Sequence, residues 1–449
     1  MSAHPAARRL PAPRVLILGI QHLIVMYTGC VTVPLVFGSA LGLSTETIGV
    51  LVNADLLVAG LVTVIQALGI SRILGVRLPI VAGASFTAVT PMILIGQQYG
   101  LQAVWGAMIA AGLFGVLIAV PFSRITRFFP PAVRGAAVTI IGLSLIGTAI
   151  GMITDGASSI GGRLALAGAV IALIVVLMRF GRGFLAQAAV LIALLAGTAV
   201  AGALSMADFS SVAGAAWFGL PQPFHFGAPT FPIAAVISMC IVMLVIFTES
   251  TAYMMSVAEM SGQRLRSGDV ARGLAADGLS GVLGGVFTSF PDTVFAQNVS
   301  LLQMTGVRSR RVVTVTGVLL VVMGLLPKLG EAVASLPTVV VGAVSLVMFA
   351  TVAGVGITTL STVRYEGTQN MLIVSLSLGI GMVPVVAPDL YSTFPTTVQI
   401  IAGGAITSCV IVAFVLNLLF NARGQQAHPA PVPAQAAAAP ALESLEGQR

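Results

Sequence analysis

Long apolar segments follow one another along the chain from Val15 to Leu419, separated by short stretches that carry arginine, glycine or proline. Many of them run for about 20 residues, which is the length a helix needs to cross the hydrocarbon core of a bilayer. The pattern predicts fourteen membrane spans. Their ranges are 15–36, 47–69, 78–96, 101–122, 132–153, 164–178, 184–205, 231–256, 270–287, 292–305, 312–327, 337–360, 371–388 and 396–420.

Two of these spans are interrupted by residues that do not favour a continuous helix. Span 3 contains "LPIVAGASFTAVTPM", with two prolines, and span 10 opens with "GGVFTSFPDTVF" and continues into the polar pair Gln297–Asn298. The chain between Arg272 and Arg308 is barely long enough for two passes, so span 10 is expected to be short, broken or partly extended. Non-helical backbone at membrane depth is tolerated where it lines a cavity or is buried in protein, which predicts a site here.

The two interrupted spans lie seven spans apart, an odd number, so the two halves are expected to be inserted in opposite directions. Paired broken helices in an inverted repeat are typical of the binding site of a transporter. The predicted organisation is a cytoplasmic N-terminus (1–14), a first seven-span repeat (15–205), a second repeat (231–420) and a disordered cytoplasmic tail (421–449), which is rich in alanine and proline.

Composition supports an integral membrane protein. The chain of 449 residues is 57% hydrophobic and 8% charged, and its mean hydropathy is +1.05. The spans leave no room for a soluble catalytic domain, and an enzyme is not predicted. A membrane enzyme requires a nucleophile–base pair or a metal cluster at membrane depth, and the sequence indicates neither. A channel requires a continuous polar stripe, which is not found either.

The positive charges predict the orientation. With the N-terminus in the cytoplasm, nineteen of the 21 Lys and Arg residues fall on the cytoplasmic side, and only Arg163 and Lys328 fall outside. A plasma or inner membrane location with both termini cytoplasmic is therefore expected. The net charge of +7 is explained by this topology, so we expect no nucleic-acid partner.

Few ionisable residues lie inside the predicted spans, where an unpaired charge costs roughly 2.5 kcal/mol or more. Glu249 follows a long apolar run and is the foremost functional candidate. His22 in span 1 is either a satisfied core residue or part of the site, and Asp277 near the start of span 9 could cap, pair or relay protons. The acids nearer the predicted interfaces, where solvation is expected, are Asp55, Asp292, Glu331, Glu366 and Asp389.

Other sites are not indicated. The cysteines Cys30, Cys240 and Cys409 are far apart in apolar runs, so we interpret them as small core residues. No nucleotide-binding motif or metal-ligand spacing is present, and no cofactor is predicted. Close helix packing is expected at small-residue pairs such as Gly147 and Gly151, or Gly281 and Gly285. Any energy coupling must come from an ion gradient, and the residues leave proton and sodium both open.

Several motifs together resemble the nucleobase-ascorbate transporter family, the nucleobase:cation symporter-2 proteins. They are "FAQNVSLLQMTG" in span 10, "QH" in span 1, "GASF" in span 3, "FTES" in span 8 and "ADG" in span 9. The resemblance implies an all-α, elevator-type transporter with fourteen spans in two inverted repeats, in which spans 1–4 and 8–11 form a core and the rest a gate. It also implies a homodimer, and short extended stretches in spans 3 and 10 that meet at the site.

The resemblance further implies the site residues. The nucleobase would be held by Glu249 and Gln297 and by backbone near Phe86 and Ala296, with Phe86 and Phe295 as stacking faces. Ser85 belongs to the same group, and His22, Asn298, Asp277 and Tyr253 would support the site or the coupling to protons, with sodium as the other candidate ion.

Glutamine at position 297, rather than glutamate, resembles the xanthine and urate transporters. This resemblance favours an oxidised purine as the substrate. The alternative substrate is uracil or another pyrimidine. A less favoured alternative is that the protein is an anion transporter of the same fold class. Three positions depart from the family pattern: Ser300 replaces a Gly, Tyr253 stands where an Asp or His is usual, and "PDTVF" replaces the common Asn-Thr-Thr pattern.

Overall fold

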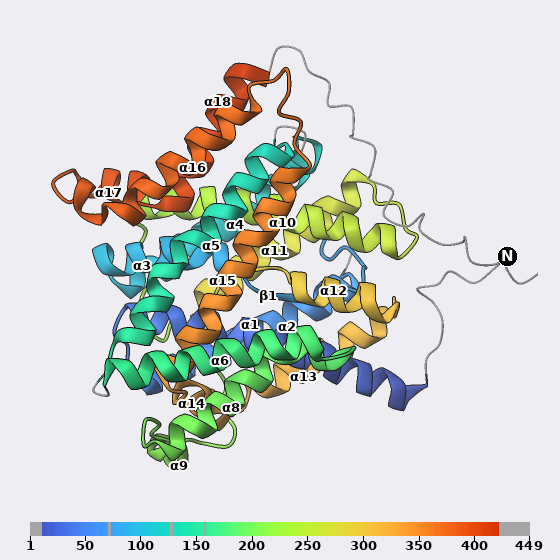
Figure 1. The fold of residues 1–449 in the computed structure, drawn as a ribbon. Helices are drawn as coiled ribbons and strands as arrows, with labels where there is room; N and C mark the ends of the chain where they lie inside the picture. Colours follow the sequence, from blue (N-terminus) through green and yellow to red (C-terminus); the bar gives the residue numbers. More distant parts are fainter. Residues whose placement is uncertain (1–10, 71–72, 126–128, 157–158, 422–449) are drawn as a thin grey trace, which may run out of the picture.

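The computed structural model describes residues 11–70, 73–125, 129–156 and 159–421. Most of the predicted N-terminal segment 1–14 and nearly all of the predicted tail 421–449 lie outside these residues. The described chain is a bundle of helices with two very short strands at its middle (Figure 1).

The elements follow the predicted order of spans. The first half consists of α1 (Ala12–Ala40), α2 (Thr45–Leu68), β1 (Ala82–Ala84), α3 (Phe86–Tyr99), α4 (Leu101–Ile125), α5 (Pro131–Thr154), α6 (Ile160–Phe180), α7 (Phe184–Gln187) and α8 (Ala189–Ala203). After α9 (Ser210–Gly214), the second half consists of α10 (Ile233–Met260), α11 (Ser267–Phe287), β2 (Asp292–Val294), α12 (Ala296–Thr305), α13 (Arg310–Gly324), α14 (Pro327–Ala334), α15 (Thr338–Ser361), α16 (Asn370–Val386), η3 (Pro388–Tyr391), α17 (Thr396–Ala402) and α18 (Ala405–Asn421).

Each of the fourteen predicted spans contains a helix or a strand followed by a helix. In the described residues, seven helices are long and apolar enough to cross a membrane, and the pairs α13–α14 and α17–α18 meet the same criterion when each is taken together across a bend of 82° or 72°. Two further apolar helices, α8 and α16, are shorter. The chain is a multi-pass membrane protein of the predicted fold class.

The interrupted spans 3 and 10 meet in a two-stranded antiparallel sheet, as predicted. Gly83 pairs with Thr293 at its centre, flanked by the pairs Ala82–Val294 and Ala84–Asp292. Each strand has three residues and leads directly into a helix, α3 or α12. The first-turn N–H groups of a helix have no partner within the helix. Those of Thr87 and Ala88 bond to Ser85, and those of Asn298 and Val299 bond to the Phe295 carbonyl, so the donors left near the sheet are at Phe86, Ala296 and Gln297.

The packing of the helices has the symmetry of an inverted repeat. The contact between α2 and α13 has its counterpart, with the repeats exchanged, in the contact between α11 and α4. Likewise α1 packs on α13 as α10 packs on α4, and α6 packs on α8 as α16 packs on α18. When the repeats are exchanged, β1 takes the place of β2 and α5 takes the place of α15. The pseudo-twofold axis therefore passes between the two members of each of these pairs.

Glycines allow the closest of these contacts. A Cβ atom at Gly112 of α4 would lie 2.5 Å from the backbone nitrogen of Val282, and one at Gly285 would lie 2.8 Å from the Trp105 carbonyl. The predicted close packing at Gly281 and Gly285 is therefore confirmed.

Gly147 and Gly151 of α5 behave differently. A Cβ atom at either position would have no atom within 4 Å, so the prediction of close packing was wrong there. Both positions line a cavity, which explains the absence of a packed neighbour.

The helices form two groups. The core consists of α1–α4 and α10–α13 with the central sheet, and the gate is built from α5, α6, α8, α15, α16 and α18, which pack mainly on each other. Helices α5 and α15 pack on each other and line one cavity together with residues of both strands. These two gate helices contact the core through α1, α3 and α10.

Candidate functional site

Glu249 lies in the middle of the long helix α10, on the side that faces the central sheet. Its side chain is half-buried, and Oε2 accepts a hydrogen bond from the Thr87 hydroxyl of α3 at 3.4 Å. The next residue, Ser250, is fully buried and its hydroxyl lies 3.0 Å from the hydroxyl of Thr293 in β2. Helix α10 therefore contacts both interrupted spans with consecutive polar residues.

A cavity of about 130 Å³ lies beside Glu249. The core lines it with Glu249 and Tyr253 of α10, Ala84, Phe86 and Thr87 of span 3, and Thr293, Val294, Phe295, Ala296, Gln297 and Ser300 of span 10. The cavity is smaller than the roughly 300–1,000 Å³ of pockets for drug-sized ligands, so it suits a small molecule.

The gate supplies the remaining wall of this cavity. Val138 and Ile141 of α5 and Thr351, Val352 and Val355 of α15 line it. These residues lie in the first half of α5 and the second half of α15, at one end of the helix pair. The site is thus divided between core and gate, with all of its ionisable groups on the core.

Two phenylalanines flank the cavity. Phe86 at the start of α3 packs edge-to-face on Phe349 of α15, with ring centroids 5.6 Å apart. Phe295 immediately precedes α12 and its backbone N–H donates to the Val81 carbonyl at 2.9 Å. The ring of Phe295 occupies the space that a side chain at Gly29 of α1 would need. Glycine at this position lets the aromatic ring reach its place beside the cavity.

His22 and Asn298 lie together outside the cavity lining. The Asn298 side-chain amide donates to the His22 carbonyl at 2.9 Å, and its Nδ2 lies 3.0 Å from Nδ1 of the imidazole. Both side chains are buried. Their contact joins the first turn of α12 to α1, and so holds the helix whose neighbouring residue, Gln297, faces the cavity.

Asp277 and Ser85 are also buried and outside the lining. Asp277 accepts a hydrogen bond from the Gln66 amide of α2 at 2.9 Å. Ser85 caps α3 through its hydroxyl, which accepts from the Thr87 N–H at 3.3 Å, and its own N–H donates to the Pro291 carbonyl at 2.9 Å. Ser85 thus extends the contact between the two interrupted spans.

The expected solvation was wrong for three of the five acids, whereas Glu366 and Asp389 are exposed as expected. Asp55 is 1% exposed, Asp292 is 0% exposed and Glu331 is 7% exposed. Asp55 lies midway along α2, whose neighbours cover it, and Asp292 lies in β2. Proline and glycine around Asp292 are typical of a surface turn, but here they belong to a strand at the centre of the bundle.

Sequence reasoning missed Thr87 and Thr293 as neighbours of Glu249 and its helix. Both follow glycine- or proline-rich stretches, and this is the one local signal that could have indicated them.

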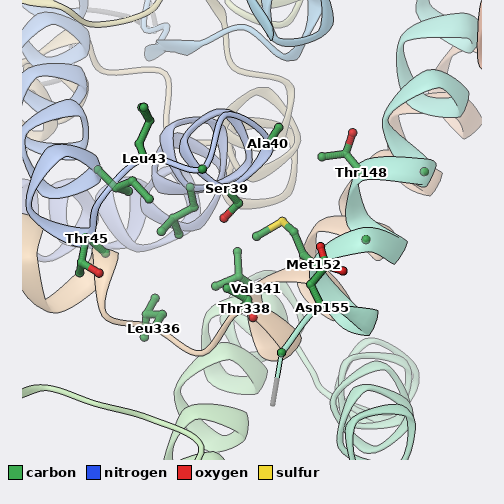
Figure 2. Close-up of a pocket in the computed structure, with 17 residues that line it drawn as sticks. Ser39, Ala40, Leu43, Thr45, Thr148, Met152, Asp155, Leu336, Thr338 and Val341 are labelled. Atoms are coloured by element: carbon green, nitrogen blue, oxygen red, sulfur yellow. The ribbon is translucent and has the colours of Figure 1, made fainter. Parts of the chain in front are cut away.

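A second, larger cavity lies at the opposite end of the α5–α15 pair. It has a volume of about 780 Å³ and is lined by the end of α1, the start of α2, the last turns of α5 and the first turn of α15. Figure 2 shows Ser39, Thr45, Thr148 and Asp155 among its side chains. Core and gate therefore enclose one cavity at each end of their contact.

Comparison with known proteins identifies the chain's relatives. The family model described as the Permease family matches residues 13–390, most of the chain. The chain belongs to this family, the nucleobase:cation symporter-2 permeases. One permease relative is the xanthine permease of Bacillus subtilis (strain 168), which is 39% identical over 91% of this chain and 94% of its own length. The uric acid transporter UacT of Escherichia coli (strain K12) is 39% identical over 94% of this chain and 88% of its own length.

The permease also has the fold of a solved structure. The transmembrane domain of the cyanobacterium bicarbonate transporter BicA aligns with a TM-score of 0.59 at 12% identity, covering 90% of this chain and 96% of that domain. At this identity the likeness concerns the fold alone, and it supports the division into core and gate.

Proposed function

We propose that this permease is a secondary active transporter that takes up a nucleobase, an oxidised purine such as xanthine or urate, by symport with protons. The observation that carries the proposal is that Glu249 and Gln297 face the same small cavity between core and gate. The ring of Phe295 lies beside them.

The two polar side chains have complementary hydrogen-bonding capacity. An ionised Glu249 accepts hydrogen bonds only, whereas the Gln297 amide both donates and accepts. The edge of an oxidised purine alternates N–H and C=O groups, which match this combination. The backbone N–H groups at the starts of α3 and α12 add further donors near Phe86 and Ala296.

The substrate class is supported by the relatives named xanthine permease and uric acid transporter. The alternative, uracil or another pyrimidine, would use the same two side chains on a smaller ring. An inorganic anion is disfavoured, because the cavity contains the Glu249 carboxylate and none of its lining residues is basic. Uptake of radiolabelled xanthine, urate, uracil and adenine by cells that lack their own permeases tests the proposal, and failure to accumulate any of the four would overturn it.

We further propose that the protein lies in the plasma (inner) membrane with both termini in the cytoplasm. The smaller cavity would then open toward the cytoplasm, since it lies at the end of α5 that carries Arg134. Single cysteines placed beside Arg124, Arg179, Arg264 and Arg308 should react with an impermeant reagent only in opened membranes. Labelling of intact cells at two or more of these positions would contradict this orientation.

The proposed transport movement carries the core, with Glu249 and Gln297, past the gate helices α5 and α15. The larger cavity, lined by Gly147 and Gly151, supplies open space at the other end of the same helices. In this proposal His22, Asp277 and Tyr253 support the site or the proton coupling, and the protein works as a homodimer. Cross-linking in native membranes tests the dimer.

A further inference from the structure

The linker between the two repeats, residues 204–232, does not have the composition of a loop in water. It contains one formally charged side chain, Asp208, and large apolar side chains recur along it. Three of them are close together in the chain and strongly exposed, and they form the apolar patch: Trp217 is 68% exposed, Phe218 78% and Leu220 78%. Exposure of neighbouring large apolar side chains to water is unfavourable, so such a patch marks a contact with another apolar phase or molecule.

The backbone holds the patch at the corner between α13 and α14. The Lys328 N–H donates to the Ala216 carbonyl at 3.0 Å, and the Gly219 N–H donates to the Leu325 carbonyl at 3.1 Å. A Cβ atom at Gly219 would lie 2.8 Å from Cγ of Pro327, so glycine allows this close approach. Both aromatic residues of the patch lie between the two bonds, and they are therefore presented outward on a fixed backbone.

The patch lies at one end of a membrane span. Helix α13 begins at Arg310, and the corner follows its last residue, Gly324. Val318 and Val322 are half-exposed and lie four residues apart, on one face of this helix, as expected of side chains that face lipid. Figure 1 shows α9, the short helix of the linker, beside α14. The patch is thus at the membrane surface opposite Arg310, where a lipid-facing side of the bundle ends.

Lys328 adds a positive charge to the patch. Its Nζ lies 4.5 Å from the centroid of the Trp217 ring. Among the described residues the one ion pair joins Arg272 to Asp269, so no carboxylate is paired with Lys328. Tryptophan at head-group level and lysine reaching outward along an apolar surface are typical of a bilayer interface. A phospholipid supplies both an anionic phosphate and an apolar chain, so one occupant satisfies both features.

The part of the linker that follows the patch is bonded to the core. The Phe224 N–H donates to the Val286 carbonyl of α11 at 2.7 Å. The ring of Phe226 stacks on Trp105 of α4, with ring centroids 6.0 Å apart. Whatever holds the patch therefore also holds the core, through α4, α11 and the α13–α14 corner.

We propose that the apolar patch inserts into the head-group region of the bilayer and anchors the core to the membrane surface, with Lys328 on the lipid phosphates. The partner is a phospholipid surface. The patch is separate from the cavity beside Glu249, and the anchor does not depend on the proposed transport function.

The chain contains two tryptophans, so fluorescence tests the contact without transport. W105F leaves Trp217 as the one tryptophan of the purified full chain, which is placed in phosphatidylcholine liposomes. Lipid brominated near the head group should quench Trp217 at least about twofold more than lipid brominated at the chain ends. The neutral aqueous quencher acrylamide should quench Trp217 at least about threefold less in liposomes than in the chain unfolded in denaturant. If W105F does not fold, the wild-type signal minus that of W217F gives the same quantity.

A matched variant removes the apolar side chains around the probe. Phe218 and Leu220 are mostly exposed, so W105F/F218S/L220S should fold, and acrylamide should quench its Trp217 at least about twofold more than in W105F. The exposed Gln222 lies in the same linker and provides the control, because W105F/Q222A should behave as W105F.

The role of Lys328 is tested with anionic lipid. Replacing part of the phosphatidylcholine with phosphatidylglycerol should reduce acrylamide quenching in W105F by about half, because an anionic surface attracts the lysine. The same exchange should leave W105F/K328Q unchanged. An equal reduction in both variants, or in neither, would overturn the role of Lys328.

Two results would overturn the anchor itself. Acrylamide quenching equal to that of the unfolded chain, without quenching by brominated lipid, would mean that the patch lies in water. Protection from acrylamide without quenching by lipid would mean that protein covers it. If this protection disappears when the protein is diluted in lipid, the occupant is a second copy of the chain.

Discussion

The two interrupted spans have the same geometry and different chemistry. Strand β1 consists of Ala82, Gly83 and Ala84, whereas β2, opposite, consists of Asp292, Thr293 and Val294. After the strands, α3 begins Phe-Thr-Ala and α12 begins Ala-Gln-Asn. The pseudo-symmetry of the fold requires that two short strands cross at the centre, but it does not require that both carry polar groups.

Small residues in one strand make room for the larger ones around the other. A Cβ atom at Gly83 would lie 2.8 Å from Cε of Met26 and 3.1 Å from the ring of Phe295. The first strand therefore acts as a close-packed support, and in the proposed function the second strand and its helix supply the side chains that contact the substrate. The two repeats thus share a backbone geometry but differ in the side chains that they place at the centre of the molecule.

The largest effect is expected at Glu249, the side chain that faces both interrupted spans. E249Q keeps the size but cannot ionise, and it should lose accumulation against a gradient. Loss of a charged hydrogen bond to the substrate costs roughly 1.5–3 kcal/mol, or about ten- to a hundredfold in affinity. Substrate binding by purified protein and uptake by cells measure the two losses.

The control is E259Q, at an exposed glutamate on the same helix, which should behave as wild type. Wild-type affinity and unchanged pH dependence in E249Q would show that Glu249 is neither a ligand nor a proton carrier. His22 or Asp277 would then be the better candidate.

Of the two interrupted spans, span 10 alone should set the substrate preference. Q297E replaces an amide donor with an acceptor, so the ratio of purine uptake to uracil uptake should change by about tenfold, equivalent to about 1.4 kcal/mol. Competition of each base against labelled substrate provides the ratio. The exposed Gln303 lies on the same helix, and Q303E should leave the ratio unchanged. Normal transport with an unchanged ratio in Q297E would contradict direct recognition.

A substitution in span 3 should change the stability of the protein instead. G83A inserts a methyl group against Met26 and Phe295, and the cost should lie at the low end of overpacking, about 1 kcal/mol, because the nearest atom is the end of the flexible Met26 side chain. We expect a lower melting temperature of the purified protein, with an unchanged ratio of purine to uracil uptake in the protein that folds. M26A alone should also lower the melting temperature because it leaves a cavity, and the loss in the double variant G83A/M26A should be smaller than the sum of the two single losses, because Met26 has the nearest atom. A changed substrate ratio in G83A would assign recognition to both strands.

The sequence predicted the membrane spans better than the polar residues that are buried between them. Apolar length and the positions of proline and glycine are local signals, and they were enough to find all spans and both interruptions. Glu249 stood out because charge inside an apolar run is costly. Asp292 did not, because its burial depends on β1 and α10, which come from other parts of the chain, as well as on the preceding helix α11. Thr87 was missed for the same reason, since it lies 162 residues from its partner.

The smallest effect is expected at Thr87, the one side chain of α3 that bonds to Glu249. T87V has nearly the same shape but lacks the hydroxyl, and T87S keeps the hydroxyl but lacks the methyl group. At 3.4 Å the bond to Glu249 is long, so its loss should cost about 0.5 kcal/mol, the low end for a hydrogen bond, or about twofold in affinity. T87V should show this loss and T87S should not. A loss of affinity of tenfold or more in T87V alone would mean that span 3 also contributes to substrate binding. Equal losses of affinity in T87V and T87S would mean that the methyl group of Thr87 matters through packing.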